Sequence, residues 1–190
     1  MLELLGYAWA KNCRHVSHGL YLGKDGKKFA TRKGKTVFMK DVLDETIELA
    51  KKEIKKRTKI SKKELEERAR KIAIAAIFYG DLKNNRNNNI VFDIERFLSF
   101  EGDTGPYLQY SYARATSILK KAPKRGKFNI GKLSNQELEL VQKLLEFQNT
   151  VIRAAETMNP SLIANYAYQL AKLFNEFYHS CPVLGSEQED

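Results

Sequence analysis

Apolar residues recur at helical spacing through most of this chain from residue 41 onward. Between residues 41 and 54 they follow one another at offsets of four, three and four, which places one row on a single helix face: Leu43, Ile47, Ala50 and Ile54. Asp41 is a good N-cap for that helix, and the capping box Ser61–Glu64 opens a second helix that should end near Gly80. Helices with one apolar row need partner helices, so the sequence predicts a mainly α fold.

The second half of the chain predicts three more helices, packed as an up-down-up bundle. We expect them over residues 106–122, 134–158 and 160–181. Thr104 or Asp103 can cap the first, and the capping box Ser134–Glu137 opens the second as one long helix. The last helix is expected to face inward with five residues: Ile163, Ala167, Leu170, Phe174 and Phe177. Such rows leave one flank apolar, so we expect a bundle truncated at its C-terminus.

The first forty residues follow a different pattern. Two short β-branched and aromatic runs, Val16–Leu22 and Thr36–Met39, bracket the loop 24–36. Two strands cannot stand alone in water, so we expect this piece to be the end of a larger sheet. By contrast, residues 83–89 hold five Asn and are expected to form a surface loop.

The loop 24–36 is basic and rich in glycine: eight of its thirteen residues are Lys, Arg or Gly, and six of these eight are Lys or Arg. The whole chain carries a formal charge of +10, and the excess collects in residues 1–40 and 120–132. Two separate cationic surfaces suit a long polyanion, and a mobile glycine-flanked loop attracts phosphate. The partner indicated is polyphosphate or nucleic acid; the alternative is a solvated hairpin tip and a charge that serves solubility.

Two tyrosines and an arginine share a face at the start of the helix 106–122. Tyr107, Tyr110 and Arg114 step by three and four residues. Two phenol rings and a guanidinium can stack unpaired bases and hold a phosphate, which is how proteins read RNA loops. The alternative is that the tyrosines pack against the next helix. Tyr178, beside the inward Phe177, is open to both interpretations.

Several functional classes are disfavoured. No Ser/His/Asp set, HExxH motif or Walker-type loop is present. Cys13 and Cys181 lie far apart, which indicates reduced thiols and a cytoplasmic protein, and a zinc site joining them to His15 and His18 is disfavoured, so no bound metal is expected. No apolar run is long enough to cross a bilayer, so no membrane partner is expected, and we predict a monomer.

Three motifs in order resemble arginyl-tRNA synthetase, a class I aminoacyl-tRNA synthetase, over nearly the full chain. They are Lys28-Phe-Ala-Thr-Arg-Lys-Gly34, then Ser99-Phe-Glu-Gly-Asp-Thr-Gly-Pro-Tyr-Leu-Gln-Tyr110, then Phe174-Asn-Glu-Phe-Tyr-His-Ser-Cys-Pro182. The resemblance implies a helical anticodon-binding bundle preceded by a small β-containing remnant of a Rossmann catalytic domain. The implied division is 1–40 for the end of the catalytic domain, 41–104 for connecting stem helices with the Asn-rich loop, and 105–190 for the anticodon-binding domain.

The resemblance also implies a function for particular residues. The intact enzyme would attach arginine to its tRNA using ATP with Mg²⁺. Four residues would lie in the loop that binds the ATP phosphates: Lys28, Thr31, Arg32 and Lys33. Four would contact the tRNA anticodon loop: Tyr107, Tyr110, Arg114 and Tyr178. Residues 84–89 would approach the inside of the tRNA bend.

This sequence departs from the family pattern by what it lacks. The His-x-Gly-His motif, the arginine pocket and the last helices of the family have no counterpart here. We therefore expect the isolated chain to be inactive in adenylate formation. The sequence is also compatible with two other hypotheses. One is a stand-alone basic helical RNA-binding adaptor without catalysis, and the other is a structural interaction domain whose charge only keeps it in solution.

Overall fold

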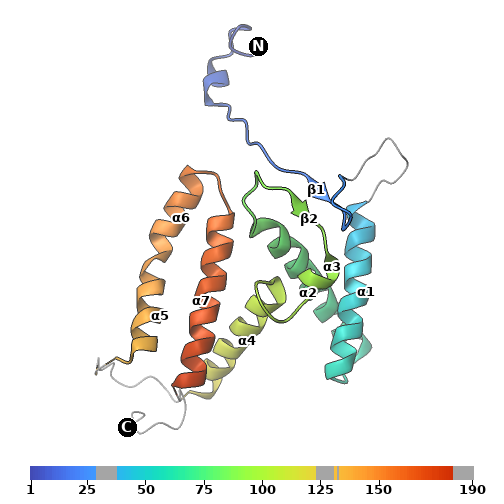
Figure 1. Ribbon diagram of the computed structural model, residues 1–190, viewed down its shortest axis with the longest axis vertical. Helices are drawn as coiled ribbons and strands as arrows, with labels where there is room; N and C mark the ends of the chain where they lie inside the picture. Colours follow the sequence, from blue (N-terminus) through green and yellow to red (C-terminus); the bar gives the residue numbers. More distant parts are fainter. Residues whose placement is uncertain (29–37, 123–130, 132, 182–190) are drawn as a thin grey trace.

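The computed structural model describes residues 1–28, 38–122, 131 and 133–181 and is mainly α-helical there (Figure 1). Its helices and strands follow in chain order: a short 3₁₀ helix Ala8–Asn12, β1 Tyr21–Leu22, α1 Met39–Arg57, α2 Lys62–Leu82, β2 Ile90–Val91, α3 Ile94–Phe97, α4 Gly105–Lys121, α5 Asn135–Leu145, α6 Phe147–Glu156 and α7 Ser161–Ser180. The prediction of a mainly α fold with a small β-containing part is confirmed.

Helices α1 and α2 form an antiparallel hairpin around the main apolar core (Figure 1). As expected, Ser61 caps α2 by accepting a hydrogen bond from the Glu64 N–H. The prediction for α1 was wrong in two details. The helix begins at Met39 rather than after Asp41, and its buried positions are Val42, Thr46, Ala50 and Ile54, whereas Leu43 and Ile47 are half-buried. Thr46 can be buried because its hydroxyl donates to the Val42 carbonyl at 2.6 Å.

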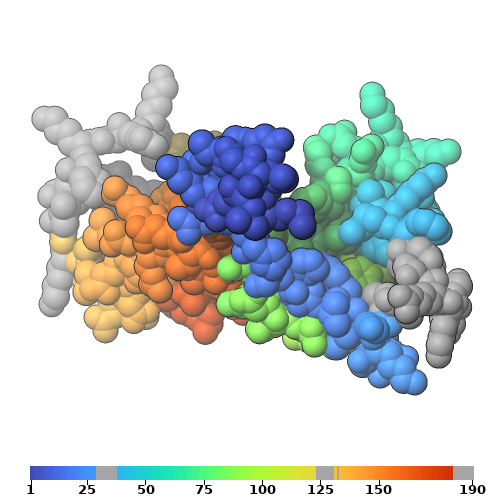
Figure 2. All heavy atoms as spheres, turned by 90° about the horizontal axis from the view of Figure 1, so that it is seen from above, coloured from blue at the N-terminus to red at the C-terminus, as the bar shows by residue number. Residues whose placement is uncertain are grey.

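The strands pair differently from the expectation. β1 runs parallel to β2, with Tyr21 opposite Ile90, so the partner of the first strand comes from beyond α2. The predicted second strand Thr36–Met39 was wrong as far as the structure describes it: Phe38 is the N-cap of α1 and Met39 its first residue. Before β1 the chain projects away from the helices (Figure 1), so in Figure 2, which looks down from above, this segment lies nearest the viewer.

The start of α4 is fixed by close contact with α2. Gly105 is buried, and a side chain on it would overlap the Ala75 carbonyl oxygen. Thr104 caps α4 by accepting from the Tyr107 N–H, as the sequence predicts. Just before this cap, Asp103 accepts a hydrogen bond from Tyr79 and pairs with Lys83, both from the α2 end. These contacts together fix the first turn of α4 against α2.

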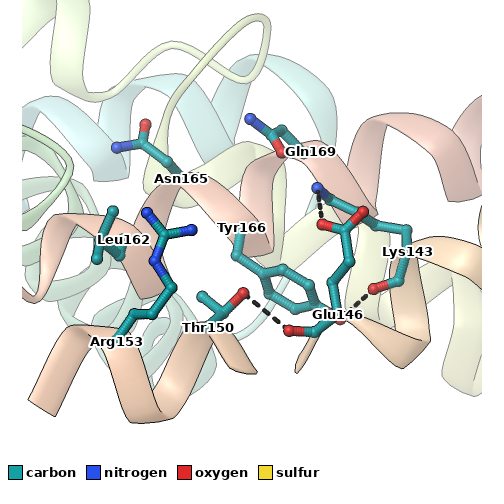
Figure 3. A pocket seen from close by; sticks show the side chains of 8 residues that line it. All are labelled: Lys143, Glu146, Thr150, Arg153, Leu162, Asn165, Tyr166 and Gln169. Atoms are coloured by element: carbon teal, nitrogen blue, oxygen red, sulfur yellow. Dashed lines mark hydrogen bonds and ion pairs between the residues drawn. The ribbon is translucent and has the colours of Figure 1, made fainter. Parts of the chain in front are cut away.

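The predicted long helix 134–158 is interrupted. Its capping box at Ser134 is present, but the helix is divided at Glu146 into α5 and α6. The Tyr166 hydroxyl of α7 donates to the Lys143 carbonyl at 2.9 Å, one turn before the break (Figure 3). A side chain that donates to a helix carbonyl competes with the backbone N–H that would bond to this carbonyl in a regular helix, and this competition accounts for the interruption.

Helix α7 lies beside α5 and α6 on one side and contacts α4 (Figure 1). Its buried residues are Ser161, Tyr166, Ala171 and Asn175. The predicted inward row was wrong, because Ile163 is exposed and the other four positions are half-buried. The buried α7 side chain at the contact with α4 is the polar Asn175, so the buried positions of α7 do not follow the apolar row. In the described part of the chain, α5 and α6 bury only Ala154.

Candidate functional site

The predicted residues on α4 and α7 meet in one cluster, called here the Arg114 cluster: Tyr107, Tyr110, Arg114 and Tyr178. The guanidinium carbon of Arg114 lies 4.7 Å from the ring centroid of Tyr110 and 4.5 Å from that of Tyr178. Its Nη2 also donates to the Tyr110 hydroxyl at 2.7 Å. Tyr110 is 51% exposed and Tyr178 is 39% exposed, so both rings reach solvent. The cluster therefore presents a fixed positive charge between two accessible aromatic rings.

Tyr107 is placed differently from the other three. Its ring is half-buried and lies 5.7 Å from the ring of Tyr168 on α7. The alternative that a tyrosine packs against the next helix therefore holds for this ring. Its hydroxyl oxygen accepts a hydrogen bond from the Asn175 amide at 2.9 Å, which ties it to the cluster.

Asn175 and Ser111 belong to the same arrangement and were not among the predicted residues. Asn175 is 8% exposed and Ser111 is 5% exposed. The Asn175 side chain contacts Arg114, Tyr107 and Ser111 together. The only signal in the sequence was a single amide between Phe174 and Phe177, in a stretch expected to be apolar.

The proposed phosphate loop is described only at its start. Lys28 is exposed and forms an isolated antiparallel bridge with Leu22, while Thr31, Arg32 and Lys33 lie outside the described residues. Nearby, Lys24 pairs with Asp93 at 3.4 Å and Glu95 at 3.5 Å. These carboxylates raise the pKa of Lys24, so it stays protonated at this edge of the strand pair.

The Asn-rich loop joins three parts of the molecule. Arg86 donates from Nη1 to the Thr157 and Met158 carbonyls at the end of α6, at 3.3 and 3.0 Å. The Asn89 side chain accepts from the Leu20 N–H at 2.9 Å, and Asn84 donates to the Gly80 carbonyl at 2.6 Å. The loop thus fixes the N-terminal segment and the α6–α7 turn to the end of α2.

A separate pocket of about 230 Å³ lies where the α5–α6 break faces α7 (Figure 3). It is lined by Lys143, Glu146, Thr150, Arg153, Leu162, Asn165, Tyr166 and Gln169. Lys143 and Glu146 pair with each other at 2.7 Å on its wall. No α4 residue lines the pocket, so it is distinct from the Arg114 cluster.

The described residues contain no group of three or more His, Cys, Asp or Glu placed to hold a metal ion. Within the same ranges, none of the helices combines the length and hydropathy needed to cross a membrane.

Both halves of the chain match the model of a known protein family. Residues 1–94 match the model for tRNA synthetases class I (R), catalytic domain, and residues 108–190 match the DALR anticodon binding domain. Together these matches define the class: a class I tRNA synthetase chain in which catalytic-domain sequence leads into an anticodon-binding helical domain. The Arg114 cluster lies almost entirely within the second match.

Individual relatives narrow this class. The chain is 44% identical to an arginine–tRNA ligase of Clostridium perfringens and 40% identical to one of Clostridium botulinum, over 99% and 100% of its own length. The arginyl-tRNA synthetase of Thermus thermophilus superposes with a TM-score of 0.86 at 33% identity, covering 99% of this chain and 32% of that one. The chain belongs to the arginyl-tRNA synthetase family. It spans about a third, 34%, of the length of these curated relatives.

Proposed function

We propose that this chain supplies the anticodon-loop binding surface of an arginine–tRNA ligase, and that the Arg114 cluster is that surface. The observation that carries the proposal is the Arg114 guanidinium held between two solvent-accessible rings, Tyr110 and Tyr178. Exposed rings can stack unpaired bases, and an arginine fixed beside them can bind phosphate or a base edge. The match of residues 108–190 to an anticodon-binding family supports the same assignment.

We further propose that the parent protein attaches arginine to its tRNA and uses ATP, with Mg²⁺, as the energy-supplying substrate. In this scheme Lys28, Arg32 and Lys33 attract the ATP phosphates electrostatically, and the Thr31 hydroxyl donates a hydrogen bond to them. The support is the basic composition of the loop and the catalytic-domain match of residues 1–94. The chain alone should give no arginine-dependent ATP–pyrophosphate exchange, even with tRNA present, and exchange above background would contradict this.

The catalytic-domain match favours the ligase over a stand-alone RNA-binding adaptor, because an adaptor needs no such segment. The division at residues 40 and 104, the monomeric state and the cytoplasmic location remain predictions.

The proposed surface is tested by measuring the affinity of the chain for an arginine tRNA transcript. Tyr110→Ala should weaken binding by about tenfold or more, because a stacked ring contributes about 1–3 kcal/mol per base. Tyr112→Ala is the matched control. Tyr112 is 74% exposed on the same helix. It follows Tyr110 by two residues, so its side chain points away from the cluster. Tyr112→Ala should bind as the parent does. Equal binding by the parent and Tyr110→Ala would refute the proposed surface.

A further inference from the structure

The Asn175 side chain uses all of its strong hydrogen-bonding groups at the α4–α7 contact. Its Oδ1 accepts from Arg114 Nη1 at 2.5 Å. Its Nδ2 donates to the Tyr107 hydroxyl at 2.9 Å and to the Ser111 hydroxyl at 2.8 Å. A buried amide without partners would be costly, and this one is fully paired within the protein.

The direction of every hydrogen bond in this network follows from Arg114. A guanidinium carries donors and no acceptor, so the oxygen of the Asn175 amide must face it, and the amide nitrogen must face the other two partners. The donors of Arg114 thus fix the orientation of the Asn175 amide. The Tyr107 and Ser111 oxygens therefore both accept from Asn175.

The two hydroxyl protons have different fates. Ser111 donates its own proton to the Tyr107 carbonyl at 3.0 Å, within the helix. The proton of the Tyr107 hydroxyl has no acceptor recorded among the described residues, and Tyr107 is half-buried rather than sealed. Tyr107 is thus left as a hydrogen-bond donor toward whatever lies against the cluster.

We propose that Asn175 is a positioning residue that sets the hydrogen-bond polarity of the RNA-facing cluster. It holds the Arg114 guanidinium between the Tyr110 and Tyr178 rings, and it commits Tyr107 to donate to an acceptor on the RNA, a base carbonyl, a ring nitrogen or a phosphate oxygen. This inference rests on the proposed function, because it assigns a donor and a supporting residue to the same surface.

A merely structural role for Asn175 predicts something different. If Asn175 only packs α4 against α7, then its volume matters and its hydrogen-bonding groups do not. The buried alanines of α2 show that a helix contact can be made without such groups. A packing residue would affect stability without changing which groups on the surface donate or accept. The test must therefore change the polarity and leave the volume unchanged.

Asn175→Asp makes that change, because a carboxylate has the same shape and no N–H; it also adds one negative charge, and the control variant adds the same charge on the same helix. Arg114 keeps its acceptor, but Tyr107 now faces a second acceptor and turns its proton inward. We expect Asn175→Asp to keep the parent's circular dichroism and weaken binding of an arginine tRNA transcript by about tenfold. Gln169→Glu is the matched control, an amide-to-carboxylate change on the same helix, at an exposed side chain that lines the separate pocket rather than the cluster. It should bind tRNA within twofold of the parent, so a loss as large as that of Asn175→Asp would overturn the inference.

Tyr107→Phe removes the donor itself and leaves residue 175 unchanged, at the cost of one hydrogen bond that the Asn175 amide donates to the Tyr107 hydroxyl. It keeps the ring against Tyr168 and should weaken tRNA binding by about fivefold in the parent. In the Asn175→Asp background it should cause no further loss, because the proton is already withdrawn from the RNA. Parent-like binding by Tyr107→Phe overturns the inference even if Asn175→Asp fails to fold.

Two further outcomes separate this inference from the proposed function. Independent, multiplicative losses in the double variant would overturn the polarity role while leaving the RNA surface in place, provided Tyr110→Ala measured in parallel still binds weakly. If Tyr110→Ala also binds as the parent does, the surface itself is wrong and the inference falls with it.

Discussion

The two sides of α4 differ in kind. Toward α2 the contact is close packing: Gly105 is buried and lies against the α2 backbone at Ala75 and Ala76. Toward α7 the contact is polar, with Ser111 and Asn175 buried at its centre. Close apolar packing contributes stability through burial and dispersion, whereas a paired polar network contributes direction. The first side therefore fixes where α4 lies, and the second fixes which groups it presents.

The difference between the two sides of α4 can be tested by mutation, and the largest loss of stability is expected at Gly105. Gly105→Ala places a methyl group onto the Ala75 carbonyl, and neither backbone can yield easily. We expect a loss of about 3 kcal/mol in the free energy of unfolding, measured with urea. Gly131→Ala is the control, because a side chain there meets open space. A cost below about 1 kcal/mol at Gly105 would show that the α2–α4 contact is looser than described.

A smaller, pH-dependent effect is expected at Tyr79, which joins α2 to the start of α4. Its hydroxyl donates to Asp103, and burial together with that carboxylate raises the pKa of Tyr79 above its ordinary value. The unfolded chain loses the tyrosine proton above about pH 10, while the folded chain keeps it. Stability from this group is therefore complete below that pH and is lost as pH rises, at up to about 1.4 kcal/mol per pH unit.

Tyr79→Phe should reduce this slope between pH 10 and 11. Burial and the carboxylate of Asp81 also raise the pKa of Tyr21. Tyr21 therefore still contributes its part of the pH dependence in the Tyr79→Phe variant. Urea unfolding of parent and variant at matched pH cancels the titration of lysines common to both. Parallel curves for the two proteins would contradict the assigned pKa shift.

The parts of the fold that local signals specify were predictable from the sequence. Ser61, Thr104 and Ser134 were expected to cap helices, and each side chain accepts from a backbone N–H in the first turn of its helix. Capping depends on residues a few positions apart, so a single sequence carries the information. The face shared by Tyr107, Tyr110 and Arg114 was predictable for the same reason.

Features that depend on distant partners were not predictable. The interruption at Glu146 involves the hydroxyl of Tyr166, and β1 finds its partner at Ile90 beyond two helices. The role of Asn175 depends on which face of α7 meets α4, a choice that periodicity assigned to the phenylalanines instead. In each case a tertiary contact decided between local alternatives.

Site-specific crosslinking tests most directly whether the Arg114 cluster is the RNA surface. An anticodon stem-loop of an arginine tRNA, carrying 4-thiouridine in its loop, would be irradiated with the chain, and the crosslinked peptides identified by mass spectrometry. The account predicts crosslinks within α4 and the C-terminal half of α7, at peptides holding Tyr107 to Arg114 and Tyr178. Crosslinks confined to α1 and α2, with none from α4 or α7, would contradict it.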